Sequence, residues 1–435
     1  MNQSLANKDK EFIWHPYTQH ALEVDSVIIT EAKGALLIDQ HGNEIIDLIS
    51  SWWTTTHGHS HPALNAALQN QVNKLDHVMF AGFSHPSAID LAEKLLNLLP
   101  PNLTKVFFSD NGSTAVEVSL KLAYQFWKNA GEIRRNKFIA FDGAYHGDTF
   151  GAMAVGKGCG FFKIYDELLF SVITTPFPET WEDDELIEEK ENYALTCFKK
   201  IIKEHSDEVA AVIIEPLIQG AAGMRFCRPG FLKKIFSIAK ENKLLVIFDE
   251  VAVGFGRTGD MFVCNSVGCR PDLLCISKGL TAGYLPLSAT ICSEKIYDCF
   301  FSKTVDKTFL HGHTFTANPL ACAVATESLD LFEREKTFDK IKNIEKRHRA
   351  FIKKIKGLDN VKKTRVLGSV LAFNLKDGLE EYKELKGEKL RKIFSKLNLN
   401  IRPIGSSVYV LPPYCISSDQ LNKAYDGIIQ GLEKI

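Results

Sequence analysis

The sequence predicts an α/β fold built on one doubly wound, mostly parallel sheet with flanking helices, together with a smaller α+β domain. Between about residues 105 and 293, seven short apolar runs alternate with helical patterns, which is typical of such a sheet. After about residue 316 the alternation ends, and a long helical stretch is followed by short strands. Two of the apolar runs end at charged residues, Asp249 and Lys278, and the functional interpretation starts from these two.

The seven apolar runs have the length and composition of strands that are buried on both faces. We expect strands at Lys105–Ser109, Lys137–Phe141, Val172–Phe177, Val209–Ile214, Leu244–Phe248, Leu273–Ser277 and Leu287–Cys292. Apolar residues at helical spacing lie between several of these runs. We expect helices at Thr114–Trp127, Tyr193–His205 and Phe231–Glu241.

A chain of 435 residues is too long for one small core and fits a large domain with a smaller one. We expect the large domain at residues 60–315 and a small domain formed by residues 1–59 and 316–435. The C-terminal part is expected to hold a basic helix, a solvated charge-rich helix and a final strand, at Lys340–Lys356, Lys376–Lys392 and Val408–Leu411.

Composition excludes several classes of partner. With 52 basic and 53 acidic residues the net charge is −1, so nothing global attracts nucleic acid or an anionic membrane. The ten cysteines are scattered without a C-x-x-C pair, as in proteins that keep reduced thiols. The start of the chain lacks the apolar core of a signal peptide, and no apolar run approaches the ~20 residues that span a bilayer. We therefore expect a cytoplasmic protein.

Asp249 and Lys278 follow two of the expected strands. In an open α/β sheet, ligands bind beyond the carboxyl ends of such strands. There, a lysine amine can form a Schiff base with an aldehyde cofactor, and a carboxylate can keep a ring nitrogen protonated. Pyridoxal 5'-phosphate (PLP) needs both groups, so the pair predicts a PLP site.

Two further turns at strand ends suit the same cofactor. Gly112 and Ser113 open a helix, where free backbone N–H groups form an anion site, and Thr114 with Glu117 fits a capping box. The PLP phosphate is the natural occupant, and the alternative is an ordinary strand-to-helix turn. Tyr145 follows another strand and could stack on a pyridine ring, although a tyrosine in a turn is usually packing.

Two other patterns resemble known motifs but favour different interpretations. Gly254–Gly259 matches the dinucleotide pattern G-x-G-x-x-G, but it is separated from the preceding strand and no helical pattern follows, which disfavours a dinucleotide site. His57, His59 and His61 alternate like metal ligands. Proline follows them, no carboxylate lies close by in sequence, and glycine favours a turn, so we expect a substrate-side loop and no metal.

Trp52 and Trp53 are adjacent, and two adjacent tryptophans are not expected to face one core together. We expect one of them to line a cleft, the alternative being one core and one interface tryptophan. Tyr17, taken alone, would be interpreted as packing.

Together these segments resemble the class III (omega) aminotransferases, PLP enzymes of fold type I, from Trp14 to Pro413. The motifs typical of the class are Asp110–Ser113, Tyr145–Gly147, Asp249–Val251, Gly254–Gly259 and Ser277–Gly279. A narrower resemblance, to one branch of the class, is carried by Trp14–Thr18, Ser51–Trp53, His311–Phe315 and Ile401–Pro403.

The resemblance implies a seven-stranded, mostly parallel sheet and a role for each motif. Lys278 would bind the cofactor covalently and then move the substrate Cα proton. Asp249 would pair with the pyridinium, Gly112 and Ser113 would hold the phosphate, and Tyr145 would stack on the ring.

The segment Gly312, His313 and Thr314 would reach the site of a neighbouring subunit, with Thr314 on the phosphate, which implies a homodimer with shared active sites. The class commonly has proline where this chain has His313.

The narrower resemblance implies amination of 8-amino-7-oxononanoate to 7,8-diaminononanoate in biotin biosynthesis, with S-adenosylmethionine as amino donor. Aromatic walls from Tyr17, Trp52 and Trp53 suit the donor's sulfonium and adenine. Arg402 matches the acceptor's single carboxylate, since a guanidinium fork fits a carboxylate well. The expected substrate pocket also includes Tyr145, Lys278 and Gly312, and Tyr17 joins Lys278 and Asp249 among the expected catalytic residues.

Three other functions remain open at this point. The first is a class III transaminase that uses a different omega-amine, and the second is a PLP aminomutase or decarboxylase. The third is a non-catalytic binding protein on the same fold, which the intact pair of Asp249 and Lys278 disfavours.

Overall fold

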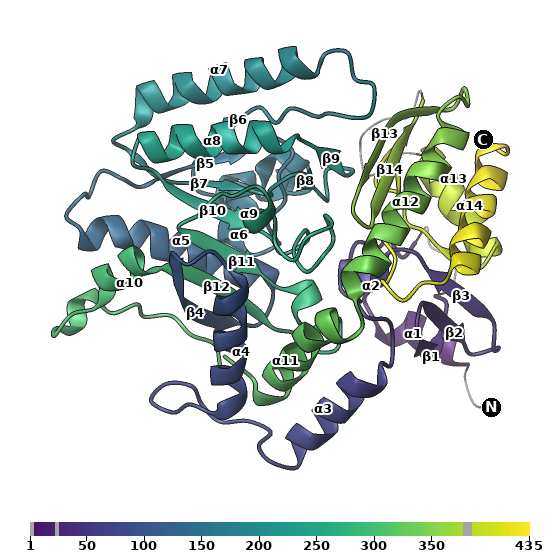
Figure 1. The fold of residues 1–435 in the computed structure, drawn as a ribbon, viewed down its shortest axis with the longest axis horizontal. Coiled ribbons are helices and arrows are strands. Elements are labelled where there is room, and N and C mark those ends of the chain that lie inside the picture. The colour runs from purple at the N-terminus through teal and green to yellow at the C-terminus, as the bar shows by residue number, and fades with distance from the viewer. Residues whose placement is uncertain (1–3, 22–25, 377–384) are drawn as a thin grey trace.

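A seven-stranded sheet forms the centre of the larger part of the molecule (Figure 1). The computed structural model describes residues 4–21, 26–376 and 385–435. In spatial order the strands are β4 (Leu103–Ser109), β12 (Ser288–Ser293), β11 (Leu273–Ile276), β10 (Leu245–Asp249), β7 (Val209–Ile214), β5 (Lys137–Phe141) and β6 (Ile173–Thr175). The predicted α/β fold is confirmed, and all seven predicted strands are present.

Only β12 runs against its neighbours. It pairs antiparallel with both β11 and β4, whereas β10 pairs parallel with β7 and β11. The observed strand ends differ from the predicted ones by at most two residues. The edge strand β6 is the shortest of the seven, with three paired residues, and only β5 pairs with it. The carboxyl ends of the parallel strands therefore share one edge of the sheet.

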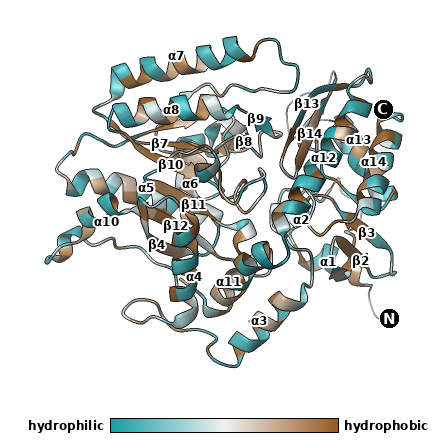
Figure 2. Ribbon diagram, viewed as in Figure 1, coloured by the Kyte–Doolittle hydropathy of each residue, from teal (hydrophilic) through white to brown (hydrophobic). Residues whose placement is uncertain are grey.

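Helices cover both faces of this sheet. On β10, Val246 and Phe248 pack toward α7 (Ile187–His205) and α8 (Pro229–Glu241), while Leu245 and Ile247 pack toward α5 (Gly112–Asn129). Side chains along a strand point alternately to opposite faces, so the continuous apolar run supplies two cores. The three predicted helices are confirmed, and each begins earlier than predicted. Figure 2 shows the strands brown and the outer face of α7 largely teal.

The smaller part joins both ends of the chain (Figure 1). One sheet has the order β1 (Ile29–Lys33), β2 (Leu36–Asp39), β3 (Glu44–Asp47) and β15 (Leu399–Asn400). A second sheet contains β13 (Val361–Leu367), β14 (Val370–Leu375) and β16 (Ser407–Val410). Because β15 pairs parallel with β3, the N- and C-terminal segments share one sheet, as the predicted small domain requires. Its boundaries at residues 59 and 316 stay a prediction.

The helices of the C-terminal part are α11 (Pro319–Arg334), α12 (Thr337–Ile355), α13 (Leu385–Lys396) and α14 (Ser418–Leu432). The predicted basic helix corresponds to α12. Of the charge-rich stretch that was predicted as a solvated helix, residues 377–384 lie outside the described residues, and α13 contains its end.

The other elements are short. They are α1 (Leu5–Phe12), α2 (Ser50–Trp53), α3 (Pro62–Val72), α4 (Pro86–Leu98), α6 (Phe150–Val155), α9 (Val263–Ser266), α10 (Glu294–Phe300), the hairpin of β8 (Ile218–Gln219) and β9 (Arg225–Phe226), and the 3₁₀ turns η1 (Lys157–Cys159), η2 (Lys163–Leu168), η3 (Lys278–Thr281) and η4 (Val305–Lys307). Within the described ranges, none of the helices combines the length and the apolar character that a membrane crossing needs.

Candidate active site

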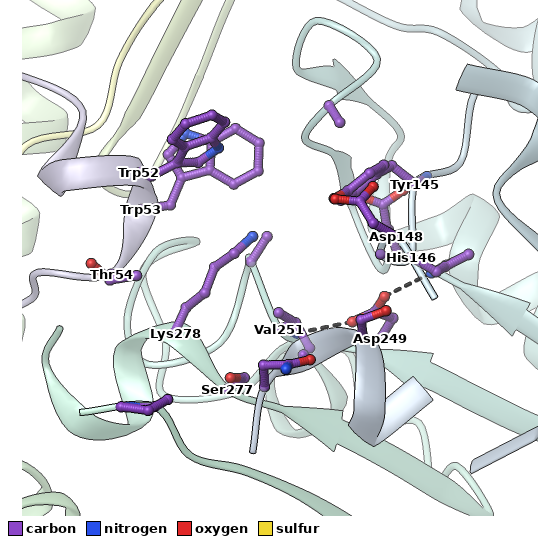
Figure 3. Close-up of a pocket in the computed structure, with 18 of the residues that line it drawn as sticks. Trp52, Trp53, Thr54, Tyr145, His146, Asp148, Asp249, Val251, Ser277 and Lys278 are labelled. Atoms are coloured by element: carbon purple, nitrogen blue, oxygen red, sulfur yellow. Dashed lines mark hydrogen bonds and ion pairs between the residues drawn. The ribbon is translucent and has the colours of Figure 1, made fainter. Parts of the chain in front are cut away.

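A cavity of about 650 Å³ lies where the carboxyl ends of the parallel strands meet the smaller part of the molecule (Figure 3). Residues that follow β4, β5, β7, β10 and β11 line one side of it. The opposite wall comes from segments near both chain ends and includes Trp52, Arg402 and Tyr409. Charged residues from the sheet edge thus face an aromatic wall across one cavity, at the position where ligands bind in open α/β sheets.

Asp249 ends β10 and is buried, with hydrogen bonds to both carboxylate oxygens. Its Oδ1 accepts the Val251 N–H at 3.1 Å, and its Oδ2 lies 2.7 Å from Nδ1 of the buried His146 (Figure 3). A buried carboxylate needs such partners to stay ionised. His146 is a partner that the sequence analysis missed, although it stands in the quoted segment Tyr145–Gly147. The arrangement could hold a proton on a ring nitrogen.

Lys278 begins η3, two residues after the end of β11, and points into the cavity (Figure 3). Its backbone φ is 43°, a left-handed conformation that lysine rarely adopts and that clusters at functional sites. The ammonium nitrogen lies 4.4 Å from the centre of the Trp53 ring. Burial lowers the pKa of Lys278 to about 8, against the opposing effect of the Asp249 and Glu215 carboxylates. The amine can therefore be neutral near physiological pH, as a nucleophile or base requires.

The helix start beside β4 has a different cap from the one predicted. Asn111 is the N-cap of α5: its Oδ1 accepts the Thr114 N–H at 3.0 Å, and Thr114 Oγ1 accepts the Asn111 N–H at 3.1 Å. The predicted capping box of Thr114 and Glu117 is therefore wrong. The helix begins at Gly112, because asparagine after an extended strand is a strong N-cap. The Glu117 carboxylate accepts the Gly151 N–H at 2.7 Å instead.

Gly112 and Ser113 form a cradle that fits a phosphate. Both line the cavity, and helix geometry leaves their N–H groups without intrahelical partners. The Ser113 hydroxyl lies 2.7 Å from that of Thr149 and accepts the Thr149 N–H at 3.0 Å. A Cβ atom at Gly147 would collide with Ser113, and φ at Gly147 is 125°. The cradle therefore depends on glycine at position 147.

Tyr145 and Tyr17 meet at the cavity, although they are far apart in sequence. Their hydroxyl oxygens are 3.4 Å apart, and Tyr17 donates to Asp148 Oδ2 at 2.7 Å. The Tyr145 ring stacks on Phe162 with the ring centres 6.0 Å apart, and burial raises the pKa of Tyr145. Asp148 had no predicted role, although it directly follows the motif Tyr145–Gly147. Its position beside that motif could have identified it as an acidic residue of the cavity.

Both adjacent tryptophans line the cavity. The residue pattern alone predicted one of them there, whereas the narrower resemblance predicted both. They belong to α2, where four consecutive residues have φ between 43° and 73° and form a left-handed turn. Successive side chains in a helical turn diverge by about 100°, so Trp52 and Trp53 can face the same space. This conformation costs roughly 1–2 kcal/mol per L-residue, so tertiary contacts must hold it in place.

The two tryptophan rings have different neighbours. Trp53 is 5% exposed, and its indole N–H donates to the Tyr409 hydroxyl at 3.2 Å. Trp52 is 44% exposed, with its ring centre 5.7 Å from that of Tyr17. The guanidinium carbon of Arg402 lies 5.3 Å from the centre of the Trp52 ring. The structure thus unites Tyr17, Trp52, Trp53 and Arg402 in one wall, as the substrate prediction requires.

Gly312, His313 and Thr314 are not among the residues that line the cavity of their own chain. His313 Nδ1 lies 2.9 Å from the Asp110 carboxylate, which does line the cavity. The segment therefore lies beside the cavity within its own chain, outside the lining.

Glu215 is a second buried carboxylate of the site that the sequence analysis missed. It follows β7, lines the cavity, and accepts the N–H groups of Tyr145 and Gly220, each at 3.0 Å. Burial raises the pKa of Glu215 to about 7. The strand-end rule that identified Asp249 would also have found Glu215, because Glu215 directly follows the apolar run that ends at Ile214.

The histidine run does not line the cavity, so the predicted substrate-side loop is wrong. His57 Nε2 bonds the Ser328 carbonyl at 3.0 Å, and His61 Nε2 bonds Glu335 at 2.8 Å. His59 Nε2 bonds the buried Asp47 at 2.9 Å. The His57 and His61 rings thus both bond the C-terminal half of α11 and its cap, whereas the His59 ring bonds the end of β3.

The G-x-G-x-x-G segment forms turns with no long helix after them, as expected. Its Arg257 is buried and donates to the Trp53 and Thr55 carbonyls, each at 3.2 Å, and to the Pro412 carbonyl at 3.1 Å. Burial lowers the pKa of Arg257. The segment therefore braces the tryptophan turn against the C-terminal part of the chain.

Comparison with known proteins agrees with this geometry. Residues 17–432 match the family model described as aminotransferase class III, so the chain belongs to that family, and PLP is its cofactor. It is 45% identical to adenosylmethionine-8-amino-7-oxononanoate aminotransferase of Synechococcus elongatus, over 97% of this chain and 99% of that protein. It is 40% identical to the protein of the same name from Geobacter sulfurreducens, over 99% and 97% of the two chains.

Solved structures extend the comparison. The crystal structure of adenosylmethionine-8-amino-7-oxononanoate aminotransferase from Methanocaldococcus jannaschii has a TM-score of 0.92 and 35% identity, covering 99% of this chain and 98% of that one. A PLP-bound amine transaminase from an uncultivated Pseudomonas species has a TM-score of 0.91 and 26% identity, covering 97% and 98%.

The environment of Lys278 predicts how fast the PLP-free protein captures PLP at different pH values. Only a neutral amine attacks the aldehyde, so the capture rate should rise through pH 8 and then level off, since the pKa of Lys278 is about 8. At pH 7 roughly one molecule in ten would be neutral, against roughly one in three thousand for an ordinary lysine. Stopped-flow absorbance between pH 6 and 10.5 measures this profile, and a rate that still climbs beyond pH 10 would contradict it.

Substitution of Gly147 should weaken PLP binding through the phosphate cradle. Gly147→Ala forces Ser113 to move, and we expect PLP affinity to fall by about tenfold or more. Gly131→Ala is the matched control, because Gly131 also has a positive φ, 85°, but open space around its Cβ position. Equilibrium dialysis should separate the two variants. Equal PLP affinities would show that the cradle tolerates a side chain at position 147.

Proposed function

We propose that this chain aminates 8-amino-7-oxononanoate to 7,8-diaminononanoate in biotin biosynthesis, with S-adenosylmethionine as amino donor. The observation that carries this proposal is the pairing of Arg402 with the Trp52 ring at 5.3 Å, in the same cavity as Lys278 and Asp249. The relatives that bear the name of this activity cover nearly the whole chain and support it.

The sheet edge supplies the groups that transamination needs. Bound PLP offers an aldehyde that takes the amino group and a ring that draws electrons from the substrate Cα. Lys278 would hold the cofactor through its amine and move the Cα proton, which its lowered pKa favours. Asp249 would hold a proton at the ring nitrogen, with its carboxylate kept in position by His146. Gly112 and Ser113 bind the phosphate through backbone N–H groups and a hydroxyl.

The aromatic wall suits both substrates in turn. The acceptor is a long apolar chain that ends in a carboxylate, so it needs an apolar slot with one cation at the far end. Trp52 and Trp53 provide the slot, and Arg402 provides the cation. The donor carries a sulfonium and an adenine, which bind well to aromatic faces. Tyr17 and Tyr145 bring their hydroxyls together at the cavity, where they would orient the reacting amine.

We also propose that the active unit is a homodimer in which Gly312, His313 and Thr314 serve the partner's site. These residues are outside the lining of their own cavity, which is consistent with a role across an interface. The surrounding segment exposes Phe301, Leu310 and other large apolar side chains, at 77% and 84% exposure for these two. Exposed apolar groups gathered in one segment mark contact surfaces, so a second copy of the chain is the natural cover.

We assign the reaction to the cytoplasm. The nine cysteines whose side chains the structure describes are all free thiols, as a reducing compartment keeps them.

The two half-reactions, measured separately, test the function and the role of Arg402. Wild-type holoenzyme should lose its bound-cofactor absorbance with S-adenosylmethionine and regain it with 8-amino-7-oxononanoate. Arg402→Ala should raise the KM for this keto acid by about 10- to 100-fold, because it loses a charge-assisted hydrogen-bonded contact of roughly 1.5–3 kcal/mol. The donor half-reaction should change less.

Arg402→Lys serves as the control, since it keeps the charge and loses the planar guanidinium. Its KM for the keto acid should lie between those of the wild-type enzyme and Arg402→Ala. Equal losses in both half-reactions of Arg402→Ala would make Arg402 a general carboxylate anchor. If the wild-type enzyme responds to another omega-amine and not to S-adenosylmethionine, the donor assignment is wrong and a different class III transaminase is the better description.

Mixed subunits test the shared site. Lys278→Ala and Thr314→Glu proteins should each be inactive, the second because a carboxylate repels the phosphate. Unfolding and refolding them together should restore about a quarter of the wild-type activity, because half of the random dimers would then carry one intact site. Size-exclusion chromatography verifies that mixed dimers form. Mixed dimers without activity would overturn the cross-subunit role of Thr314.

A further inference from the structure

A buried carboxylate outside the cavity connects the two halves of the substrate wall. Asp47 ends β3 and has no exposed surface. Its Oδ2 accepts the Ser51 hydroxyl at 2.8 Å and lies 2.9 Å from His59 Nε2. Its Oδ1 accepts the Asn400 side-chain N–H at 3.0 Å. The turn at Ser51, the loop at His59 and the distant strand β15 therefore converge on one side chain.

Two of these contacts lead directly to the wall. Ser51 lies in the left-handed turn, immediately before Trp52. Asn400 is the last residue of β15, pairs with Asp47 in the sheet register, and precedes Arg402 by two positions. Asp47 thus bonds Ser51, which precedes Trp52 by one position, and Asn400, which precedes Arg402 by two. The guanidinium carbon of Arg402 and the centre of the Trp52 ring are 5.3 Å apart.

The third contact gives Asp47 a fixed support. His59 exchanges backbone hydrogen bonds with Gly34, at 3.0 Å from the Gly34 N–H and 2.7 Å from the His59 N–H. The backbone of His59 is therefore anchored to a residue of the loop between β1 and β2, which supports the residue whose ring contacts Asp47. Burial raises the pKa of Asp47, but the hydrogen bonds from His59 and Ser51 outweigh it and lower the pKa overall. The carboxylate is consequently ionised and accepts bonds at both oxygens.

We propose that Asp47, supported by His59, is a positioning residue that fixes the separation of the Trp52 ring and the Arg402 guanidinium. It thereby sets how well the cavity accepts a substrate with an apolar chain and a terminal carboxylate. Asp47 touches neither substrate nor cofactor and acts through the wall. The identity of that substrate rests on the proposed function, whereas the positioning role does not.

Asp47→Asn tests the proposal, because an amide is nearly the same size but presents an N–H₂ group where the carboxylate has an acceptor. We expect the KM for 8-amino-7-oxononanoate to rise by about three- to tenfold, a part of the effect of Arg402→Ala. The absorbance of bound PLP and the PLP affinity should stay at wild-type values, because the sheet edge is unchanged. An unchanged KM would overturn the proposal.

His61→Gln is the matched control. It breaks another histidine–carboxylate pair of the same run, His61 with Glu335 at 2.8 Å, which has no contact with the tryptophan turn. The control should leave the KM near the wild-type value at a comparable loss of thermal stability. If both variants raise the KM equally, the effect of Asp47 is general destabilisation and the positioning role is refuted.

A double-mutant cycle shows whether Asp47 acts through Arg402. In the Arg402→Ala background, Asp47→Asn should add less than twofold to the KM, since the group that it positions is already gone. Fully multiplicative effects would mean that the two residues act independently, which contradicts the proposal. If Asp47→Asn does not fold, Ser51→Ala and Asn400→Ala each remove one contact, and each should raise the KM by a smaller factor.

A readout without substrate separates this proposal from the proposed function. Acrylamide quenching of Trp52, taken as the difference from the same protein with Trp52→Phe, should increase in Asp47→Asn and not in His61→Gln. Increased quenching in a protein that does not aminate 8-amino-7-oxononanoate would leave the positioning role standing and the substrate assignment wrong. Unchanged quenching would remove Asp47 from the support of the turn, whatever the substrate.

Discussion

Parallel pairing of β7, β10 and β11 brings three chemically active side chains to one edge of the sheet. Glu215 directly follows β7, Asp249 is the last residue of β10, and Lys278 lies two residues after β11. Because the strands are parallel and in register, their carboxyl ends lie side by side. This pairing alone places the three side chains at the same edge of the sheet. The reversed strand β12 lies beyond β11 and leaves this edge intact. The cofactor chemistry therefore depends first on strand direction.

Burial at that edge then sets the electrostatics. Glu215 and Asp249 are buried next to Lys278, and burial raises the pKa of Glu215 to about 7 while it lowers that of Lys278 to about 8. Desolvation raises the pKa of an acid and lowers the pKa of a base. Both pKa values are therefore brought toward the pH at which the groups exchange protons easily. The Asp249 carboxylate is held in place by its contact with His146 and by the hydrogen bond from the Val251 backbone. One edge therefore contains groups suited to moving a proton and one suited to holding it.

The sequence predicted the sheet edge well and the wall less well, for a physical reason. Asp249, Lys278 and the Gly112 turn were found because short-range rules place residues at strand ends and helix starts. The tryptophan turn has a left-handed backbone that no local propensity favours, so the residue pattern alone predicted only one tryptophan at a cleft. Besides the nearby Asp47, the turn contacts Arg257, which is 204 residues away in sequence and comes close only in the folded chain.

The capping error has the same origin on a smaller scale. Thr114 and Glu117 have the right spacing for a capping box. However, Asn111 is the N-cap of this helix, because it follows an extended strand and its side chain accepts the Thr114 N–H. Glu117 is then free to cap α6, where its carboxylate accepts the Gly151 N–H. Through this bond the phosphate cradle and the Tyr145 loop are braced against each other. A local pattern thus identified the right helix, while tertiary structure decided which residue caps it.

Fold and wall contribute to function at different levels. An amine transaminase with 26% identity shares the whole architecture, with a TM-score of 0.91, so the sheet and its edge define a class of chemistry and not one substrate. The choice of substrate must then come from the wall, which is made of segments near both chain ends. Those segments are joined by the pairing of β3 with β15, where Asp47 faces Asn400. The short pairing of β3 with β15 therefore joins the two chain segments that form the wall. Through it, the choice of substrate depends on how the smaller part of the molecule packs.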